Sequence, residues 1–551
     1  MAWTKTIAYT LATCSLWLPT KADNIWPNEA TDELEKMLFE QQNPFESSLA
    51  TFAVPCSASG LAIGRGFGAE WIRNAYHDMA TADVQAGTGG IDASIVFEKD
   101  RPENPGAGFQ ETLDFFRPRY TTRSSLADLF AMGAVFGVGG CSNGNIILPY
   151  RAGRVDATGP GPSGVPEPQE DLATHTAKFV RQGFNTTEMI ALVACGHTVG
   201  GVHGVDFPEI VPNPQPPPVT GPFGNDNTVF FDTTTSNFDN QVAKEFVANI
   251  SQNPLAFGHN ETTRSDFRIF NADGGDMISQ MAESQDFFSQ TCATLLERMI
   301  NTVPPSVKLT DVLQPLPVKP RKWSIDVNAD KTLTVSLTLR IVDTLLGGGI
   351  QALVKPVSRT GAALPATSPV VIGNISTSTC DYPNCGPGFV YLDYSINIPA
   401  EQGISSFTVD VTDSSTGKTT TYNNGGAGFP LSDAVQPQMS LSTQTTKTIN
   451  GVTLQQLNVT AAVYNADQYT NISLIVPQPS NFSATISPWV AEVAPMKASG
   501  KIAGTNYTLY TGSWLASNES APQHPFDILA TGPKGSASST FNSWGDVPFV
   551  L

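Results

Sequence analysis

The spacing of apolar residues changes near residue 310, and this change limits what the chain can fold into. Before that point apolar residues recur every three to four positions, as in amphipathic helices; after it, short segments alternate apolar and polar residues, as half-buried strands do. The chain has 551 residues, and single cores stop growing beyond about 250 to 300 residues. The sequence therefore predicts a multidomain protein, with a mostly α domain followed by an all-β, sandwich-like C-terminal region.

The N-terminal part reads as one helical domain, which we place at residues 23–310. The expected helices are 69–79, 125–135, 171–182, 187–195, 238–248 and 285–301. Long loops rich in glycine and proline, such as 158–168 and 212–225, separate some of them. Loops of that length inside a domain usually line a site or hold an ion.

The C-terminal part follows a proline-rich connector at 311–322. Alternating segments at 323–327, 333–339, 407–411 and 457–463 are expected to be strands, with turn residues between them. Many short strands of this kind are typical of antiparallel sandwiches. The length suits two β-sandwich-like modules, at 323–435 and 436–551, although no internal repeat marks their boundary.

The N-terminus resembles an export signal. Lys5 precedes the apolar stretch 7–18, and the small residues Thr20 and Ala22 suit cleavage after Ala22, so residues 1–22 are expected to be a signal peptide. The apolar stretch is shorter than the about 20 residues that span a bilayer. We therefore expect a secreted, extracellular protein.

Nine Asn-x-Ser/Thr sequons fit a glycoprotein, although so short a motif also occurs by chance. They are Asn185, Asn249, Asn260, Asn374, Asn458, Asn471, Asn481, Asn506 and Asn518.

The net charge excludes one class of partner. At −19 the chain has no basic balance with which to bind nucleic acid, and an acidic surface stays away from anionic lipid. We expect neither a nucleic-acid nor a membrane partner, and we expect a monomer.

The cysteines point to disulfides. Of seven cysteines, Cys14 leaves with the signal, and an even number in an exported chain indicates pairing. Cys380 and Cys385 are near enough to close a small loop. The other four are Cys56, Cys141, Cys195 and Cys292, and their spacing leaves all three pairings open.

The first motif with chemical meaning is the segment 71–78. On a helix, Arg73 and His77 are four residues apart and share a face with Tyr76 beside them, whereas Asp78 points elsewhere. A base next to a cation suits peroxide cleavage, because the base moves a proton while the cation stabilises developing charge. Alone, such a pair is more often a surface or structural feature.

Further motifs follow in order. Residues 90–94 form an oxygen-rich loop suited to a hard cation, which Asp78 could complete. An apolar helix ends at His197, a second oxygen-rich loop covers 231–239, and Asp266 lies among apolar residues. A lone histidine in such a place is usually a satisfied core residue, so only the set carries weight.

Taken together, these motifs resemble the plant-type haem peroxidase superfamily, and specifically its secreted fungal, class II-like branch. The resemblance covers roughly residues 50–318 and includes 127–129, 152–154 and 165–168. It implies haem b as cofactor, with hydrogen peroxide and small reducing molecules as substrates. No resemblance guides the β-rich extension.

On the distal side, the resemblance implies that His77 is the acid–base catalyst and Arg73 its cationic partner. Asn104 would orient the distal imidazole. The aromatic residue beside them is Tyr76, where the family usually has Phe or Trp.

On the proximal side, the resemblance implies that His197 ligates the haem iron. Asp266 would hold its other ring nitrogen, and Phe231 would pack against the ring. A carboxylate on that nitrogen gives the imidazole partial imidazolate character, which stabilises higher iron oxidation states.

The resemblance implies two calcium ions as well, and Asp78 and Thr198 each directly follow a haem-site histidine. The distal ligands would be Asp78, Gly90, Asp92 and Ser94, and the proximal ligands Thr198, Asp232, Thr234, Asn237 and Asp239.

The sequence departs from the manganese-oxidising and ligninolytic relatives. Where the former carry three acids, this chain has Glu70, Gly66 and His203, and the surface tryptophan of the latter falls at Leu192. We therefore expect direct oxidation of small phenolic or aromatic donors at the haem edge.

The family comparison favours the disulfide Cys56–Cys141, which leaves Cys195–Cys292. The alternative function is a non-catalytic glycoprotein that retains a peroxidase scaffold for wall adhesion. The C-terminal modules could also bind cell-wall or plant polysaccharide through Trp489, Trp514 and Trp544, although edge or core positions are the commoner roles of such residues.

Overall fold

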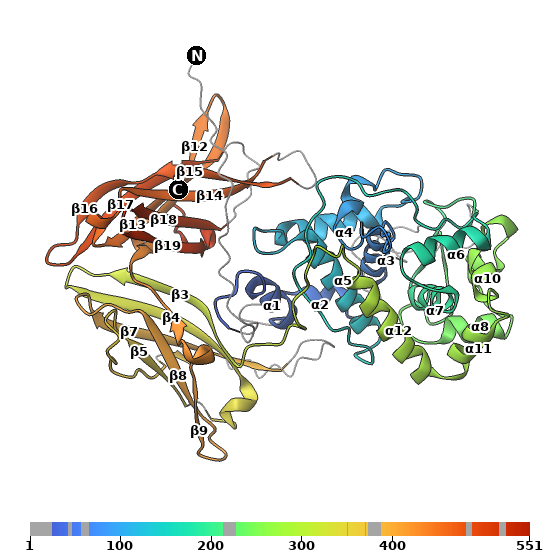
Figure 1. The fold of residues 1–551 in the computed structure, drawn as a ribbon, viewed down its shortest axis with the longest axis horizontal. Helices are drawn as coiled ribbons and strands as arrows, with labels where there is room; N and C mark the ends of the chain where they lie inside the picture. Colours follow the sequence, from blue (N-terminus) through green and yellow to red (C-terminus); the bar gives the residue numbers. More distant parts are fainter. Residues whose placement is uncertain are drawn as a thin grey trace.

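The computed structural model describes residues 25–41, 47–56, 65–212, 227–349, 351–369, 371–372, 387–480, 487–516 and 525–550. The expected signal peptide, Cys380, Cys385 and the sequons at Asn374, Asn481 and Asn518 lie outside the described residues. Helices gather at one end of the molecule and sheets at the other (Figure 1). The multidomain, α-then-β fold class is thus confirmed. No helix in the described ranges is long and apolar enough to cross a membrane.

The helical part is built around one buried helix. Its helices are α1 (Asp32–Phe39), α2 (Leu49–Ala53), α3 (Phe67–Met79), α4 (Gly108–Phe116), α5 (Leu126–Cys141), α6 (Leu172–Arg181), α7 (Thr186–Gly196), α8 (Gln241–Val247), α9 (Pro254–Phe257), α10 (Ser265–Phe270), α11 (Asp276–Glu283) and α12 (Gln285–Ile300). Every residue of α5 is buried, as its all-round apolar sequence requires. Gly137 of α5 lets α3 approach, because a Cβ there would lie 2.6 Å from the Gly68 carbonyl oxygen. The distal motif therefore rests on the centre of the core.

The first β module, residues 318–430, contains two antiparallel sheets. One is β3 (Val318–Val327), β4 (Thr332–Val342), β7 (Phe389–Pro399) and β6 (Val371–Ile372) in that order; the other joins β10 (Phe429–Pro430), β8 (Ser406–Thr412) and β5 (Ala352–Val357), with β9 (Thr419–Tyr422) also on β8. Both sheets contribute to one apolar core. Strand β3 begins inside the stretch expected to be a connector; the register shifts between Pro320 and Lys322, which is how a strand accommodates a proline.

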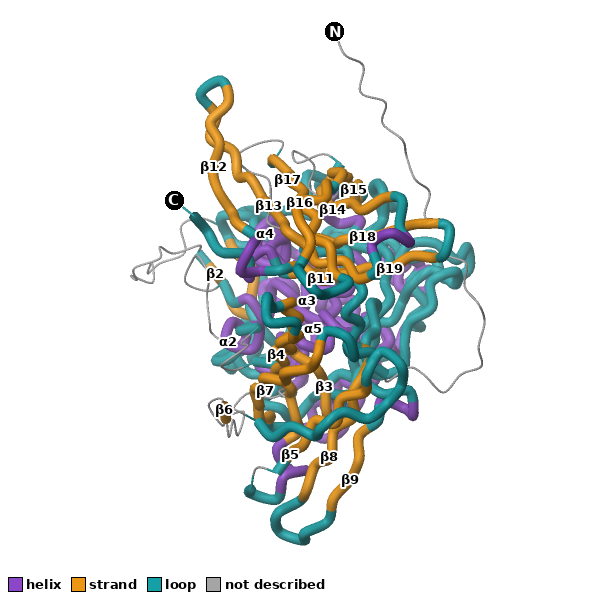
Figure 2. The backbone as a smooth tube through the Cα atoms, turned by 90° about the vertical axis from the view of Figure 1, so that its left-hand side faces the viewer, coloured by secondary structure: helices purple, strands orange, loops and turns teal. Residues whose placement is uncertain are grey.

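The second β module, residues 435–542, repeats this arrangement. One sheet contains β11 (Val435–Pro437), β12 (Thr443–Ile449), β13 (Val452–Tyr464), β17 (Tyr507–Leu515) and β16 (Lys497–Lys501), and the other contains β15 (Trp489–Pro495), β14 (Asn471–Pro479), β18 (Phe526–Gly532) and β19 (Gly535–Asn542). The hairpin of β12 and β13 projects from the module (Figure 2). Its turn, Asn450–Gly451, has positive φ at both residues, as a type I′ turn requires.

The tryptophans proposed as a polysaccharide platform do not form one. Trp514 and Trp544 are 5% and 3% exposed and pack against each other in the core of the second module. Trp489 pairs with Tyr120 of the helical part, with ring centroids 5.1 Å apart. The core and edge roles weighed for these residues are therefore the ones observed.

The N-terminal segment joins the helical part to the first β module. The Trp26 side chain lies in that module's core, and its backbone exchanges two hydrogen bonds with the Asn424 side chain. On α1, Leu34 and Leu38 belong to the helical core, whereas Glu35 faces β3 and β4. The segment therefore belongs to both bodies rather than to the helical domain alone.

Candidate active site

A cavity of about 360 Å³ lies in the helical part and is lined by residues of α3 and α7. His77 and Arg73 of α3 line it, as do His197 and Phe231 of the other side. The chain thus brings together, in one cavity, the two histidine motifs that lie 120 positions apart in sequence.

The distal imidazole is held in one tautomer. His77 Nδ1 lies 2.8 Å from Asn104 Oδ1, and Asn104 Nδ2 donates to the Glu98 carbonyl, which fixes which end of the amide faces the histidine. Because an amide oxygen only accepts, the proton is on Nδ1 and Nε2 keeps its lone pair. Burial, and then the positive charge of Arg73, hold the pKa of His77 well below its usual value. His77 is therefore a neutral base.

The distal cation lies against an aromatic ring. The Arg73 guanidinium is 4.2 Å from the Phe109 ring centroid and donates to the Pro105 carbonyl oxygen at 2.9 Å. Burial lowers the pKa of Arg73 to about 10, while Asp206 and Glu70 act in the opposite direction. Arg73 therefore stays charged at neutral pH and can stabilise negative charge in the cavity.

The proximal imidazole is held in the same tautomer by a different partner. Helix α7 starts with a capping box between Asn185 and Glu188, and His197 is its C-cap residue. His197 Nδ1 lies 2.9 Å from Asp266 Oδ2, and Phe231 stacks on the ring at 4.4 Å and 13°. Because a carboxylate accepts, His197 Nε2 also keeps a lone pair, and this nitrogen suits a metal.

Comparisons with known proteins agree with this geometry. A family model described as "Peroxidase" matches residues 57–284. Residues 57–284 are a peroxidase domain. Three relatives are a WSC domain-containing protein of Arthroderma benhamiae (37% identical over 413 residues, 72% of this chain and 54% of that protein), the versatile peroxidase VPS1 of Pleurotus eryngii (26% over 307 residues, 53% and 75%) and a putative L-ascorbate peroxidase 6 of Arabidopsis thaliana (32% over 148 residues, 25% and 42%).

The relatives differ in how much of this chain they match. At 413 residues, the likeness to the Arthroderma protein is longer than the whole span 57–284, so it extends beyond the peroxidase domain. This chain spans about half the length of that protein and under half of the Arabidopsis protein. The resemblance to plant-type peroxidases is confirmed for the domain.

The expected distal calcium residues of the peroxidase domain lie together. Asp78 accepts the backbone amides of Asp92, Ala93 and Ile95, and Asp92 accepts the amide of Ser94. Burial raises the pKa values of both aspartates. Ser94 Oγ is buried without a hydrogen-bond partner, which fits a hard-cation ligand.

Most of the expected proximal calcium residues also meet. Thr234 Oγ1 donates to Asp239 Oδ1, and Thr198 contacts the Asp239 backbone. Burial and Asp239 raise the pKa of Asp232 to about 7, and Asp232 Oδ2 is buried without a partner. Asn237 is exposed, and its backbone N–H donates to the Thr234 carbonyl within the loop.

Neither loop could bind calcium through side-chain acids alone. Across the described part of the chain, no three His, Cys, Asp or Glu side chains gather as a metal site. Calcium would therefore depend on hydroxyl and carbonyl oxygens, such as those of Ser94 and Gly90.

The residues that mark departures from the family are placed as follows. Tyr76 is buried, and its ring stacks on Phe179. Its hydroxyl donates to Gln182 Oε1 at 3.4 Å, and burial raises the pKa of Tyr76. Leu192 is 3% exposed, so its position does not reach the surface. His203 Nδ1 lies 2.8 Å from Thr228 Oγ1.

Sequence reasoning named Glu70 but missed its interaction with a second acid. Glu70 lines the cavity, and burial together with Glu111 of α4 raises the pKa of Glu70 to about 8. It also missed Asn253, whose Nδ2 donates to Asp266 Oδ2 at 2.7 Å. The Asn253-Pro254 pair at the start of α9 predicts that Asn253 is an N-cap residue. Its hydrogen bond to Asp266 joins separate segments, and no pattern in the neighbouring sequence predicts it.

Two disulfides join segments of the helical part. Cys56 pairs with Cys141 and Cys195 with Cys292. The pairing favoured by the family comparison is confirmed, and with it the pairing left for the other two cysteines.

Proposed function

We propose that this protein is a secreted haem peroxidase. It reduces hydrogen peroxide and oxidises small phenolic or aromatic donors in one-electron steps at the haem edge. The observation that carries the proposal is the pair of imidazoles on one cavity, each with Nδ1 engaged and Nε2 available. An amide fixes His77 as a base, and a carboxylate makes His197 a stronger ligand.

Haem b fits the donor set of this cavity. His197 would ligate the iron through Nε2, with Asp266 and Asn253 holding the imidazole and Phe231 supporting its face. Haem, when bound, supplies the redox chemistry.

The distal residues would handle the proton and the charge. His77 Nε2 would take a proton from one peroxide oxygen and return it to the other, so that the second oxygen can leave as water, and haem, when bound, would supply the two electrons for the cleavage. Arg73 stabilises the negative charge that develops on the departing oxygen. Asn104 keeps the base in the tautomer that this transfer requires.

The donor class rests on which oxidation routes the chain retains. Of the three positions expected for manganese-binding acids, one holds an acid, Glu70, and it lies beside Arg65. Leu192 is buried where a surface tryptophan would serve. Assays on phenols, Mn(II) and veratryl alcohol distinguish the three routes, and we expect turnover of phenols alone.

Export and calcium are part of the proposal. The two disulfides are typical of proteins that fold in oxidising compartments, which supports secretion, and the sequons support glycosylation. The unpartnered buried oxygens of Ser94 and Asp232 support two calcium sites that brace the segments directly after the two histidines.

The visible spectrum before and after peroxide tests the proposal. A Soret band that changes with peroxide is expected, and a colourless product that cannot take up hemin would contradict it. His77→Leu should keep the haem and slow the reaction with peroxide by roughly 10²- to 10⁴-fold, as expected for a lost general base. His197→Ala should disturb or abolish haem binding; an unchanged peroxide rate in His77→Leu would make the distal assignment wrong.

A further inference from the structure

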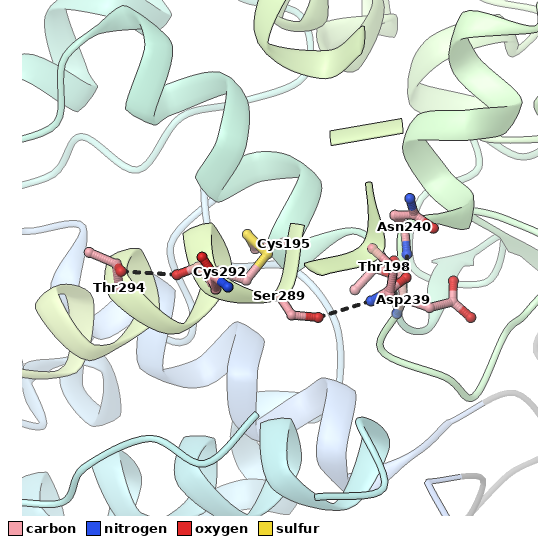
Figure 3. Close-up of a disulfide and its surroundings, with 9 residues drawn as sticks. Cys195, Thr198, Asp239, Asn240, Ser289, Cys292 and Thr294 are labelled. Atoms are coloured by element: carbon pink, nitrogen blue, oxygen red, sulfur yellow. Dashed lines mark hydrogen bonds between the residues drawn. A yellow bond between two sulfur atoms is a disulfide. The ribbon is translucent and has the colours of Figure 1, made fainter. Parts of the chain in front are cut away.

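Two residues close to His197 in sequence, one on each side, fix the backbone to other segments of the helical part. Two residues before His197, Cys195 forms a disulfide with Cys292 in the middle of α12, and both residues are 0% exposed. One residue after His197, Thr198 is hydrogen-bonded to the Asp239 backbone through its hydroxyl. Figure 3 shows the disulfide on one side of this segment and Thr198 with Asp239 and Asn240 on the other.

The Thr198 contact leads back to the same helix as the disulfide. The backbone N–H of Asn240 donates to Gln285 Oε1 at 2.9 Å, and Gln285 is the first residue of α12. Asn240 Nδ2 donates to two carbonyls near the end of α11, which holds this loop in place. The residues 195–198 therefore form one side of a closed ring, and α12 forms the opposite side.

The backbone inside this ring is the place where α7 ends, at a glycine. Helix α7 ends at Gly196, directly before His197, and a Cβ added at Gly196 would meet nothing within 4 Å. Glycine gives the chain more backbone freedom than any other residue. Without the disulfide, the Thr198 contact and the last turn of α7, which includes the hydrogen bond from the His197 amide to the Val193 carbonyl, would hold the backbone here.

We propose that the Cys195–Cys292 disulfide positions the proximal imidazole, setting where His197 Nε2 enters the cavity. This inference rests on the proposed function, since it concerns the same iron ligand. Both cysteines are wholly buried, so the disulfide acts as a permanent clamp and not as a switch that a reductant reaches in the folded protein.

The chain contains a matched control. Cys56–Cys141 closes a loop of nearly the same length, with a sequence separation of 85 against 97. Loop-closure entropy depends weakly on length, so the two disulfides should stabilise the fold to a similar degree. The Cys141 side chain lies against Gly68 of α3, and its backbone carbonyl accepts the Phe238 amide, a contact that Cys141→Ala leaves in place. If the Cys195–Cys292 disulfide only stabilised the fold, removing either disulfide should have the same effect on the His197 segment.

The test compares the C195A/C292A and C56A/C141A variants of the full chain. Both should lower Tm by similar amounts. Only C195A/C292A should shift or broaden the iron–histidine stretching band in the ferrous holoprotein, measured by resonance Raman. In the haem-free protein, only C195A/C292A should speed amide hydrogen exchange at 195–199, by about tenfold or more. Adding G196A to C195A/C292A should recover part of both effects, because alanine restricts the backbone at a site with room for its methyl group.

Two results would overturn the positioning role. One is a wild-type stretching band and wild-type exchange in C195A/C292A; the other is equal changes in both double variants. If the protein takes up no haem, the Raman experiment fails together with the proposed function. Amide exchange in the haem-free protein still tests whether the disulfide holds the His197 segment in place. If the alanine pair does not fold, C195V/C292A refills part of the lost volume and is read by the same two outcomes.

Discussion

At the scale of single residues, His77 and His197 are the same side chain with opposite tasks, and the partner of Nδ1 separates them. An amide oxygen on Nδ1 leaves His77 an ordinary neutral base, whereas a carboxylate on Nδ1 makes His197 a more basic ligand. The sequence pattern could place both histidines on helices. It could not place Asn104 and Asp266 within hydrogen-bonding distance, because those contacts join separate segments; the resemblance to the family supplied them.

The burial of His77 leads to a pH prediction for the peroxide reaction. Its pKa lies well below the ordinary value of about 6.5, so the base form persists as pH falls. The second-order rate with peroxide should therefore stay constant from pH 8 to below pH 6 and decline only under more acidic conditions. Stopped-flow measurements across this range check it. A decline centred at pH 6.5 would show that the buried imidazole titrates as an exposed one does.

At the scale of elements, the helices that carry the site were predictable and several of their neighbours were not. The apolar spacing marked α3 and α7 correctly because both have long buried faces. Helix α1 is eight residues long and divides its side chains between two bodies, and α4 has nine residues. Such short segments give weak periodic signals. Strand β3 was expected to start later because proline is rare in strands.

The calcium loops next to α3 and α7 give a prediction about metal removal. The pKa values of Asp78, Asp92 and Asp232 are raised in the folded chain, so the folded state holds protons that the unfolded state releases. Stability without calcium must then fall as pH rises from about 4 towards 7. Calcium should reverse this, because it takes the place of those protons.

Calorimetry with and without EDTA measures this effect. Chelation should lower Tm by roughly 5 °C or more at pH 8 and by clearly less at pH 5. Asp311→Asn is a suitable control, because it removes an acid outside both loops and should leave the EDTA effect unchanged. An equal effect of EDTA at both pH values would contradict the proton–calcium competition.

At the scale of the whole molecule, the two halves are joined by contacts that no local pattern reveals. Arg340 of β4 is 0% exposed and pairs with Glu35 and Glu40 of the N-terminal segment. The Tyr120 ring of the peroxidase domain contacts the Trp489 ring of the second β module at a tilted angle. The change of composition near residue 310 correctly divides helices from strands, but the division of the polypeptide into bodies depends on such distant pairs.

Glu35 should make a measurable contribution to this junction. Lys319 and Arg340 overcome the effect of burial and lower the pKa of Glu35 to about 2 from 4.5, a shift equivalent to about 3 kcal/mol. This contribution is complete above about pH 4.5 and is lost as pH falls through 2. Glu35→Gln should cost about 3 kcal/mol at pH 7 and progressively less in acid, measured by urea unfolding. Glu33→Gln, on the same helix, breaks a partly exposed ion pair with Lys36 alone and should cost clearly less.

Removal of the β modules tests how far the peroxidase domain depends on them. A chain ending at Pro317 would strip the Trp26 side chain of its apolar surroundings and leave Glu35 and Glu40 without their cations. Breaking buried ion pairs from one side costs roughly 3 to 5 kcal/mol. The truncated chain should therefore unfold at lower urea concentration than the full chain. Neutralising the stranded acids in the truncated chain, by Glu35→Gln and Glu40→Gln, should recover part of the loss while Leu34 and Leu38 stay in the helical core. If the truncated chain were as stable as the intact protein, the contacts between the two halves would not stabilise the peroxidase domain.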